Sequence, residues 1–390
     1  MALIKCKNCN GEVSSMAKKC PHCGTSLVPN KDIICSECGN KIKDGASVCD
    51  KCGCPISQDK KIAETAKEKI YGSLDKLTGA RVKNYVSVKD LFKNTFKKHS
   101  QDDLDEVFVC GSKNTTPNPK DIDLKKASAW VYFRVFIFFL ISFVIMYIGY
   151  VDYQNDNFLP GLIFIGGFAV PITVLIFFFE INLFRNIPFY KVIKYFLLGG
   201  CFSLIVAILY FSIFTVGELD YFGALMVGLI EEAAKAIIVV FFLFREKRSN
   251  YILDGLLIGA AVGAGFAAFE TAGYILKYGL KYNFATMLDV LKIRAILAPG
   301  GHVAWAAIEG AALMYVKGLN GKLSKEHINN KTFLLICLIP TVLHGIWDMP
   351  INIPYNLLQI GLTVAAWVVV IYFINLGLKQ IDDVKNKRKD

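Results

Sequence analysis

The chain has 390 residues, 54% of them hydrophobic, and a formal net charge of +11. This composition excludes a single soluble domain, because residues 1–128 are polar and rich in lysine and cysteine, whereas apolar blocks of about 20 residues make up most of the rest. Much of the lysine and arginine flanks these blocks and sets membrane topology, so the positive charge does not indicate a protein that binds nucleic acid.

A cysteine repeat opens the chain. Two CxxC pairs occur in CKNCNGEVSSMAKKCPHCG and again in CSECGNKIKDGASVCDKCG, with every cysteine displaced by 29 positions. Four thiolates at this spacing can surround Zn²⁺, and a four-cysteine site has no open position for catalysis. The repeat predicts two structural zinc ions. The ligands are Cys6, Cys9, Cys20 and Cys23 in a first zinc ribbon (1–28) and Cys35, Cys38, Cys49 and Cys52 in a second (29–57).

Residues 58–128 are charged and have a modest apolar content. KKIAETAKEKIYGSLDKL and VKDLFKNTFKKHSQDDLDEVF have apolar residues at helical spacing, which predicts small helices within a charged cytosolic linker. The first twenty residues contain no apolar core of signal-peptide length, so we expect the N-terminus to lie in the cytosol. We expect the zinc ribbons there to bind a protein partner.

Eight apolar blocks follow, each close to the length of a membrane helix. They lie at residues 129–151, 158–180, 192–215, 222–244, 252–276, 294–317, 332–349 and 354–377. With both termini in the cytosol, every basic cluster, including the tail at 379–390, lies inside, except one outer loop with Lys277 and Lys281. The sequence therefore predicts an all-α polytopic bundle of about eight transmembrane helices at 129–378, in the cell membrane.

Four of these blocks carry ionisable residues away from their ends. A charge at the centre of a membrane helix costs about 2.5–3.5 kcal/mol, which makes such residues functional candidates. They are Glu231, Glu232 and Lys235 in the fourth block, Glu270 in the fifth, His302 in the sixth, and His344 and Asp348 in the seventh. In the eight-span arrangement they converge on the middle and outer half of the bilayer. We therefore expect one polar site inside the bundle.

These groups suit hydrolysis of a peptide bond. A carboxylate can take a proton from the attacking water, and histidines can polarise the carbonyl or stabilise the oxyanion. Asp348, one helical turn after His344, would set the tautomer of that ring. Lys235 lies between the two glutamates on the helix face. We expect its ion pair with Glu231, one helical turn away, to be the less strained one and Glu232 to be the better candidate for the base.

The sequence does not decide whether this site binds a metal ion. No HExxH motif occurs, yet His302, His344 and a carboxylate would form a zinc site with an open position. We favour glutamate chemistry without a metal. A non-catalytic scaffold for a partner helix and a proton-coupled transporter would also use buried carboxylates and histidines. The lack of an apparent inverted repeat argues against the transporter.

The motifs resemble those of a known family. EEAAK at 231–235, FAAFE at 266–270, His302 followed by Gly310, and HGIWD at 344–348 resemble the four motifs of the PrsW intramembrane proteases and, more distantly, type II CAAX prenyl endopeptidases. The cysteine repeat resembles bacterial double zinc ribbons. The resemblance implies a bacterial intramembrane peptidase that cuts a single-span membrane protein, typically an anti-sigma factor in stress signalling. It also implies that the base is Glu231 or Glu232 and that Glu270, His302, His344 and Asp348 complete the site.

Overall fold

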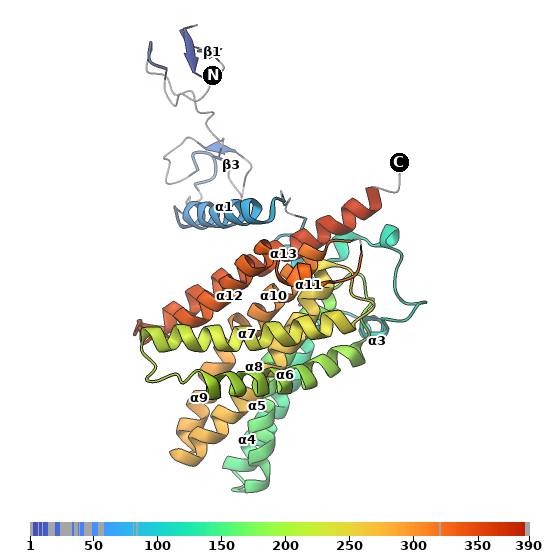
Figure 1. Ribbon diagram of the computed structural model, residues 1–390, viewed down its shortest axis with the longest axis vertical. Coiled ribbons are helices and arrows are strands. Elements are labelled where there is room, and N and C mark those ends of the chain that lie inside the picture. The colour runs from blue at the N-terminus through green and yellow to red at the C-terminus, as the bar shows by residue number, and fades with distance from the viewer. Residues whose placement is uncertain are drawn as a thin grey trace. The chain divides into compact units, whose positions relative to one another are not determined.

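A computed structural model describes residues 3–6, 8–9, 11–14, 20–23, 33–34, 38, 40–42, 49–53, 58–80, 82, 85–319 and 321–386. The chain forms two compact units, Met1–Lys69 and Ile70–Asp390. The first contains the cysteine repeat, and the second contains the long helices (Figure 1).

Among the described residues of the first unit, two short hairpins lie beside the cysteines. β1 (Leu3–Lys5) pairs antiparallel with β2 (Glu12–Ser14), and β3 (Ile33–Ile34) pairs in the same way with β4 (Lys41–Ile42). In the first ribbon, all four cysteine sulfurs lie close enough to hold one ion. In the second, Cys38, Cys49 and Cys52 form a similar group, while Cys35 lies outside the described residues. The thiols thus converge as the spacing predicts.

Backbone amides favour the thiolate form of one cysteine in each set. The amides of Asn8 and Cys9 lower the pKa of the Cys6 thiol. Those of Cys52 and Lys51 lower the pKa of Cys49 to about 6. Since the thiolate is the form that binds a metal, both sites fit zinc.

Removing half of the first ligand set should remove one zinc ion per chain. In a variant with Cys6→Ser and Cys9→Ser only two thiols of that set remain, too few to close a tetrahedral site. Elemental analysis of the purified protein measures the loss. Cys201→Ser in α6 (Phe189–Ile213), which lies outside both sets, is the matched control and should leave the zinc content unchanged. An unchanged zinc content in the double variant would show that the ligand assignment is wrong.

Residues 85–130 pack on the helices that follow. After α1 (Gln58–Thr78), two short helices begin at serine capping boxes, α2 (Val88–Phe92) and α3 (Gln101–Phe108). The 3-10 turns η1 (Pro119–Asp121) and η2 (Leu124–Lys126) follow. Val86 and Leu91 are buried in the same hydrophobic core as the long helices. This segment therefore belongs to the second unit.

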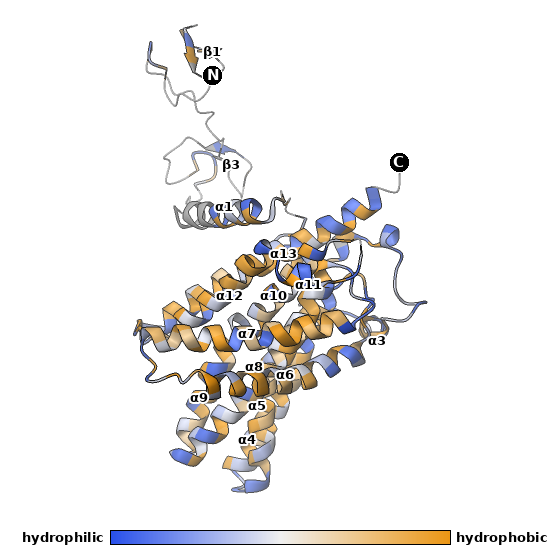
Figure 2. Ribbon diagram, in the orientation of Figure 1, coloured by the Kyte–Doolittle hydropathy of each residue, from blue (hydrophilic) through white to orange (hydrophobic). Residues whose placement is uncertain are grey.

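In the part of the chain that the structure describes, nine longer helices build the bundle. They are α4 (Val131–Val151), α5 (Leu159–Ile181), α6, α7 (Tyr221–Arg245), α8 (Ile252–Lys281), α9 (Phe284–Leu297), α10 (His302–Lys317), α12 (Lys331–Asp348) and α13 (Leu357–Asn386). Short elements join them: η3 (Asp156–Phe158), η4 (Ala298–Gly300), α11 (Lys325–Ile328) and η5 (Pro354–Asn356). Figure 2 shows apolar residues along these helices and hydrophilic residues at the ends of α4 and α9. The prediction of zinc ribbons followed along the chain by an all-α membrane bundle is confirmed.

The number of spans remains a prediction. Within the described ranges, six helical segments are long and apolar enough to cross a membrane. α7 and α10, which correspond to two further predicted blocks, are not among them. α7 carries Glu231, Glu232 and Lys235 at its centre, and α10 has only 16 residues.

The sixth predicted block, 294–317, is not one helix. α9 ends at Leu297, η4 turns the chain, and α10 begins at His302. Pro299 lacks the amide hydrogen that a continuing helix needs, and its carbonyl accepts a hydrogen bond from Trp367 Nε1 at 2.9 Å. The break places His302 at the start of a helix instead of within one.

α8 is the central helix, and its residues from Ile252 to Ala268 are all buried. Three of its glycines, Gly255, Gly259 and Gly263, lie one turn apart and face the backbone of α10. A Cβ added at any of them would overlap an α10 carbonyl oxygen. Small residues at this spacing let two helices approach closely. The stripe therefore brings α10, and with it His302, against the helix that carries Glu270.

Candidate active site

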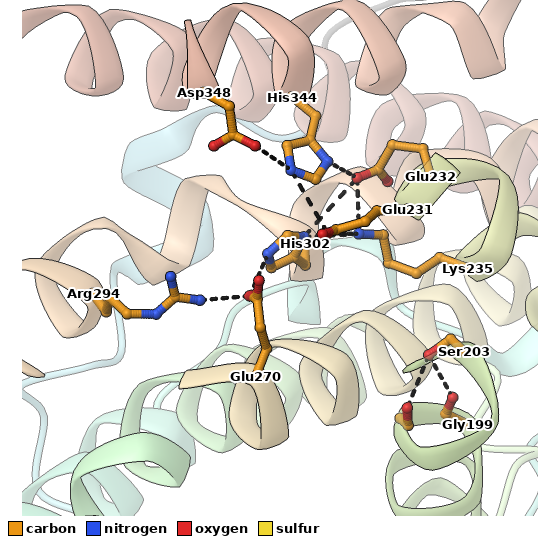
Figure 3. A network of polar contacts seen from close by, with 11 residues as sticks. Gly199, Ser203, Glu231, Glu232, Lys235, Glu270, Arg294, His302, His344 and Asp348 are labelled. Carbon is orange, nitrogen blue, oxygen red and sulfur yellow. Dashed lines mark hydrogen bonds and ion pairs between the residues drawn. The ribbon is translucent and has the colours of Figure 1, made fainter. Parts of the chain in front are cut away.

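The ionisable residues of the apolar blocks meet inside the bundle (Figure 3). They are Glu231, Glu232 and Lys235 of α7, Glu270 of α8, His302 of α10, and His344 and Asp348 of α12. Polar contacts of 2.6–4.0 Å connect all of them in one network. The structure thus brings together every residue that the sequence predicts for the membrane site.

Lys235 lies at the centre of this network. Its Nζ is 2.9 Å from Glu232 Oε1 and 3.7 Å from Glu231 Oε2. Glu232 therefore forms the closer ion pair, whereas the helical positions favoured the pair with Glu231. That expectation used only the helical positions on α7, but Glu232 Oε1 is also held by α12, since His344 Nδ1 lies 2.6 Å away. Lys235 and Glu232 are both buried, so their pairing lowers the cost of placing charge in the bundle.

His302 bridges α7 and α8. Its Nδ1 lies 2.8 Å from Lys235 Nζ, and an ammonium group can only donate a hydrogen bond. Nδ1 is therefore the acceptor, and the Nε2–H group donates to Glu270 Oε2 at 3.0 Å. Glu270 thus sets both the tautomer and the orientation of this ring.

His344 is surrounded by three carboxylates. Glu232 Oε1 lies 2.6 Å from Nδ1, whereas Asp348 Oδ2 and Glu231 Oε2 lie 3.4 and 3.7 Å from Nε2. The nearest acceptor, Glu232, orients the ring, and not Asp348 as the spacing along α12 suggested. Trp305 of α10 stacks on the ring at a centroid distance of 4.6 Å and holds it from one face.

A metal ion fits the same residues. Glu231, His302 and His344 each offer one ligand atom, and these atoms lie within 4.8 Å of one another. Glu231 Oε2 is buried and has no hydrogen-bond partner in the described part of the chain. Two histidines and a carboxylate form a common catalytic zinc set, and carboxylates that accept from the other ring nitrogens, as Glu232 and Glu270 do, commonly support such ligands.

The side chains of the cluster differ in their exposure. The side chains of Lys235, Glu232 and His344 are 0–4% exposed, those of Glu231, His302 and Glu270 are 11–17% exposed, and that of Asp348 is 27% exposed. Exposure therefore increases from the buried lysine toward Asp348 and Glu270. Water and a peptide would reach the carboxylates from this side.

Two charged residues near the cluster were missed in the sequence. Arg294 of α9 contacts Glu270, with Nη2 and Oε2 2.5 Å apart. It is the first residue of the sixth predicted block, at the outer membrane boundary. The positive-inside rule makes a basic residue unusual there, and this could have drawn attention to it. Glu309 of α10 is almost fully buried, and its Oε2 has no hydrogen-bond partner among the described residues. It could have been found in the sequence as a carboxylate two helical turns after His302.

Comparisons with known proteins agree with this geometry. The model of the PrsW family, described as intramembrane metalloproteases, matches residues 187–376, and that of the double zinc ribbon matches residues 6–53. Protease PrsW of Clostridioides difficile is 31% identical over 195 residues, which cover 48% of this chain and 78% of that protein. Protease PrsW of Oceanobacillus iheyensis is 24% identical over 192 residues, covering 47% and 82%. Protease PrsW of Bacillus subtilis is 25% identical over 185 residues, covering 47% and 79%. No solved structure matches the chain.

These matches confirm the resemblance read from the motifs, including the zinc of the N-terminal repeat. They also bear on the metal at the membrane site. The family description names metalloproteases, so it favours the zinc alternative over the metal-independent chemistry that we expected. The protein is therefore a multi-pass membrane protease. It lies in the lipid bilayer, and its substrates are membrane proteins. The chain belongs to the PrsW family of intramembrane proteases.

Proposed function

We propose that this protease cuts a single-span membrane protein at the α7–α8–α10–α12 cluster, with Glu231 as the base that takes a proton from the attacking water. One observation carries the assignment: Glu231 and Glu232 each have a buried oxygen without a hydrogen-bond partner among the described residues, but the ion-pair contacts of Glu231, to Lys235 and His344, are both as long as 3.7 Å. Glu232 is less suited, because Lys235 and His344 both contact its Oε1. This choice replaces the expectation that Glu232 is the base.

The other residues have supporting roles in this proposal. Lys235 Nζ, 3.7 Å from Glu231 Oε2, brings positive charge near the carbonyl oxygen on which negative charge develops. His344 Nε2 faces both Glu231 and Asp348, so it can hold a proton and return it to the leaving amine. Glu232 keeps that ring oriented.

In the alternative with a metal, Glu231, His302 and His344 would hold a zinc ion; Glu231 would then be a ligand instead of the base, and His302 Nδ1 would bind the ion in place of its hydrogen bond from Lys235. When bound, such an ion polarises the carbonyl group and lowers the pKa of its bound water. Glu232 and Glu270 would then support the two histidines through their other ring nitrogens.

The experiment is cleavage of a panel of single-span proteins by the purified protease in liposomes. Anti-sigma factors belong in this panel because the motif resemblance points to them. Cleavage that depends on Glu231 supports the proposal. A protein that binds these substrates but cuts none would favour a scaffold.

We further propose that both termini are cytosolic, supported by the basic residues of the inner loops and of the tail. An impermeant maleimide applied to intact cells should label Tyr153→Cys, in the predicted first outer loop, but not Asn386→Cys at the end of α13. Both positions are exposed in the structure. Labelling of Asn386→Cys from outside would contradict this topology. The wild-type chain measures background labelling.

A further inference from the structure

Arg294 contacts the cluster from α9, a helix that carries none of the family motifs. Its Nη2 donates to Glu270 Oε2 at 2.5 Å, and its Nε donates to Thr271 Oγ1 at 3.1 Å. The guanidinium carbon also lies 4.4 Å from the centre of the Tyr274 ring. Two separate N–H groups and the planar face are thus engaged at once. A guanidinium held in this way has one position, which an ammonium group could not reproduce.

The same carboxylate oxygen receives both Arg294 and His302. Glu270 Oε2 lies 2.5 Å from Arg294 Nη2 and 3.0 Å from His302 Nε2. The side chain of Glu270 is 17% exposed, so packing alone does not fix its position. Without the arginine, a neutral imidazole would be the nearest remaining donor to this oxygen. The charge-assisted bond from Arg294 is the stronger of the two and keeps the carboxylate in place.

His302 needs such support because of its place in the chain. It is the first residue of α10 and follows the η4 turn, so no earlier turn of α10 lies beside its ring. Its ring must nevertheless present Nδ1 to Lys235 at 2.8 Å. The bond from Nε2 to Glu270 supplies the second point that defines the plane of the ring.

We infer that Arg294 is a positioning residue of the protease, which fixes Glu270 and through it orients His302. This inference rests on the proposed function, because the orientation of His302 matters only if the cluster cuts the peptide bond. Thr271 contributes to this positioning, since its hydroxyl group accepts a hydrogen bond from Arg294 Nε and so fixes the second edge of the guanidinium.

The test uses the full-length protease in liposomes with a substrate that it cuts. Arg294→Ala should lower kcat by about 10–100-fold, the usual effect of losing an outer carboxylate partner, with KM little changed. Guanidinium ion added to this variant should restore part of the rate, and Arg294→Lys should retain part of it. Lys292→Ala is the matched control: Lys292 is exposed on the same helix, 3.2 Å from Asp289, and its loss should change nothing.

A double-mutant cycle separates positioning from a merely structural role. Thr271→Val should lower kcat in the wild-type background and have no further effect in Arg294→Ala, because the contact it removes is already gone. Additive losses without guanidinium rescue would overturn the inference. So would an Arg294→Ala variant that cuts at the normal rate while His302→Ala is inactive. If His302→Ala also cuts normally, the proposed function itself fails.

Discussion

Glu231→Gln is expected to lower the rate of substrate cleavage by about 10²–10⁴-fold, the contribution of a positioned general base. Glutamine keeps the size of the side chain but cannot accept the proton from water. Glu231 makes the longer of the two contacts with Lys235, 3.7 Å against 2.9 Å for Glu232. The variant should therefore remain folded, with a thermal unfolding temperature near that of the wild type. Initial rates in liposomes and unfolding in detergent measure the two properties.

Glu232→Gln distinguishes the two roles. It should also slow cleavage, because His344 loses the acceptor at Nδ1, but it should lower the unfolding temperature as well, because Lys235 loses its closest charge partner. Glu218→Gln, at an exposed glutamate in the loop before α7, is the control for the substitution itself and should alter neither property. A Glu231→Gln, Glu232→Gln double variant that cuts at the wild-type rate would end the hypothesis of glutamate-dependent cleavage.

The residues that form the site could be predicted from the sequence, because burying a charge in a membrane helix costs free energy and such residues stand out in an apolar block. A charged residue inside a block of apolar residues requires compensation, and EEAAK in the fourth block shows three at once. Placing each block at its depth in the bilayer then brings His302 and His344 to the same layer as the glutamates. No knowledge of how the helices pack was needed for this step.

The pairing within the site could not be predicted in this way. Helical geometry orders Glu231, Glu232 and Lys235 relative to one another, but His344 of α12 decides which glutamate the lysine contacts. The partner of Glu270 was missed for a related reason. Arg294 belongs to α9, which the pattern merged with α10 into one block, because Pro299 and two glycines were read as a break before His302 and not as the end of a separate helix.

Lys235→Met is expected to destabilise the folded protein by about 3–5 kcal/mol, the usual cost of leaving a buried charge without its partner. Methionine fills a similar volume beside Phe266, whose ring centre lies 4.0 Å from Lys235 Nζ, so lost packing contributes little. The cost arises at Glu232, whose side chain is 1% exposed and would keep His344 at 2.6 Å and His302 at 4.0 Å as its partners.

Adding Glu232→Gln to Lys235→Met removes the unpaired charge, so the double variant should be more stable than Lys235→Met alone. Both should be inactive, since the double variant has also lost the acceptor that orients His344. Unfolding in detergent at a fixed protein concentration measures the stabilities. Equal stability of the single and double variants would show that the charge of Glu232 costs nothing without Lys235, because His344 is then a sufficient partner for it.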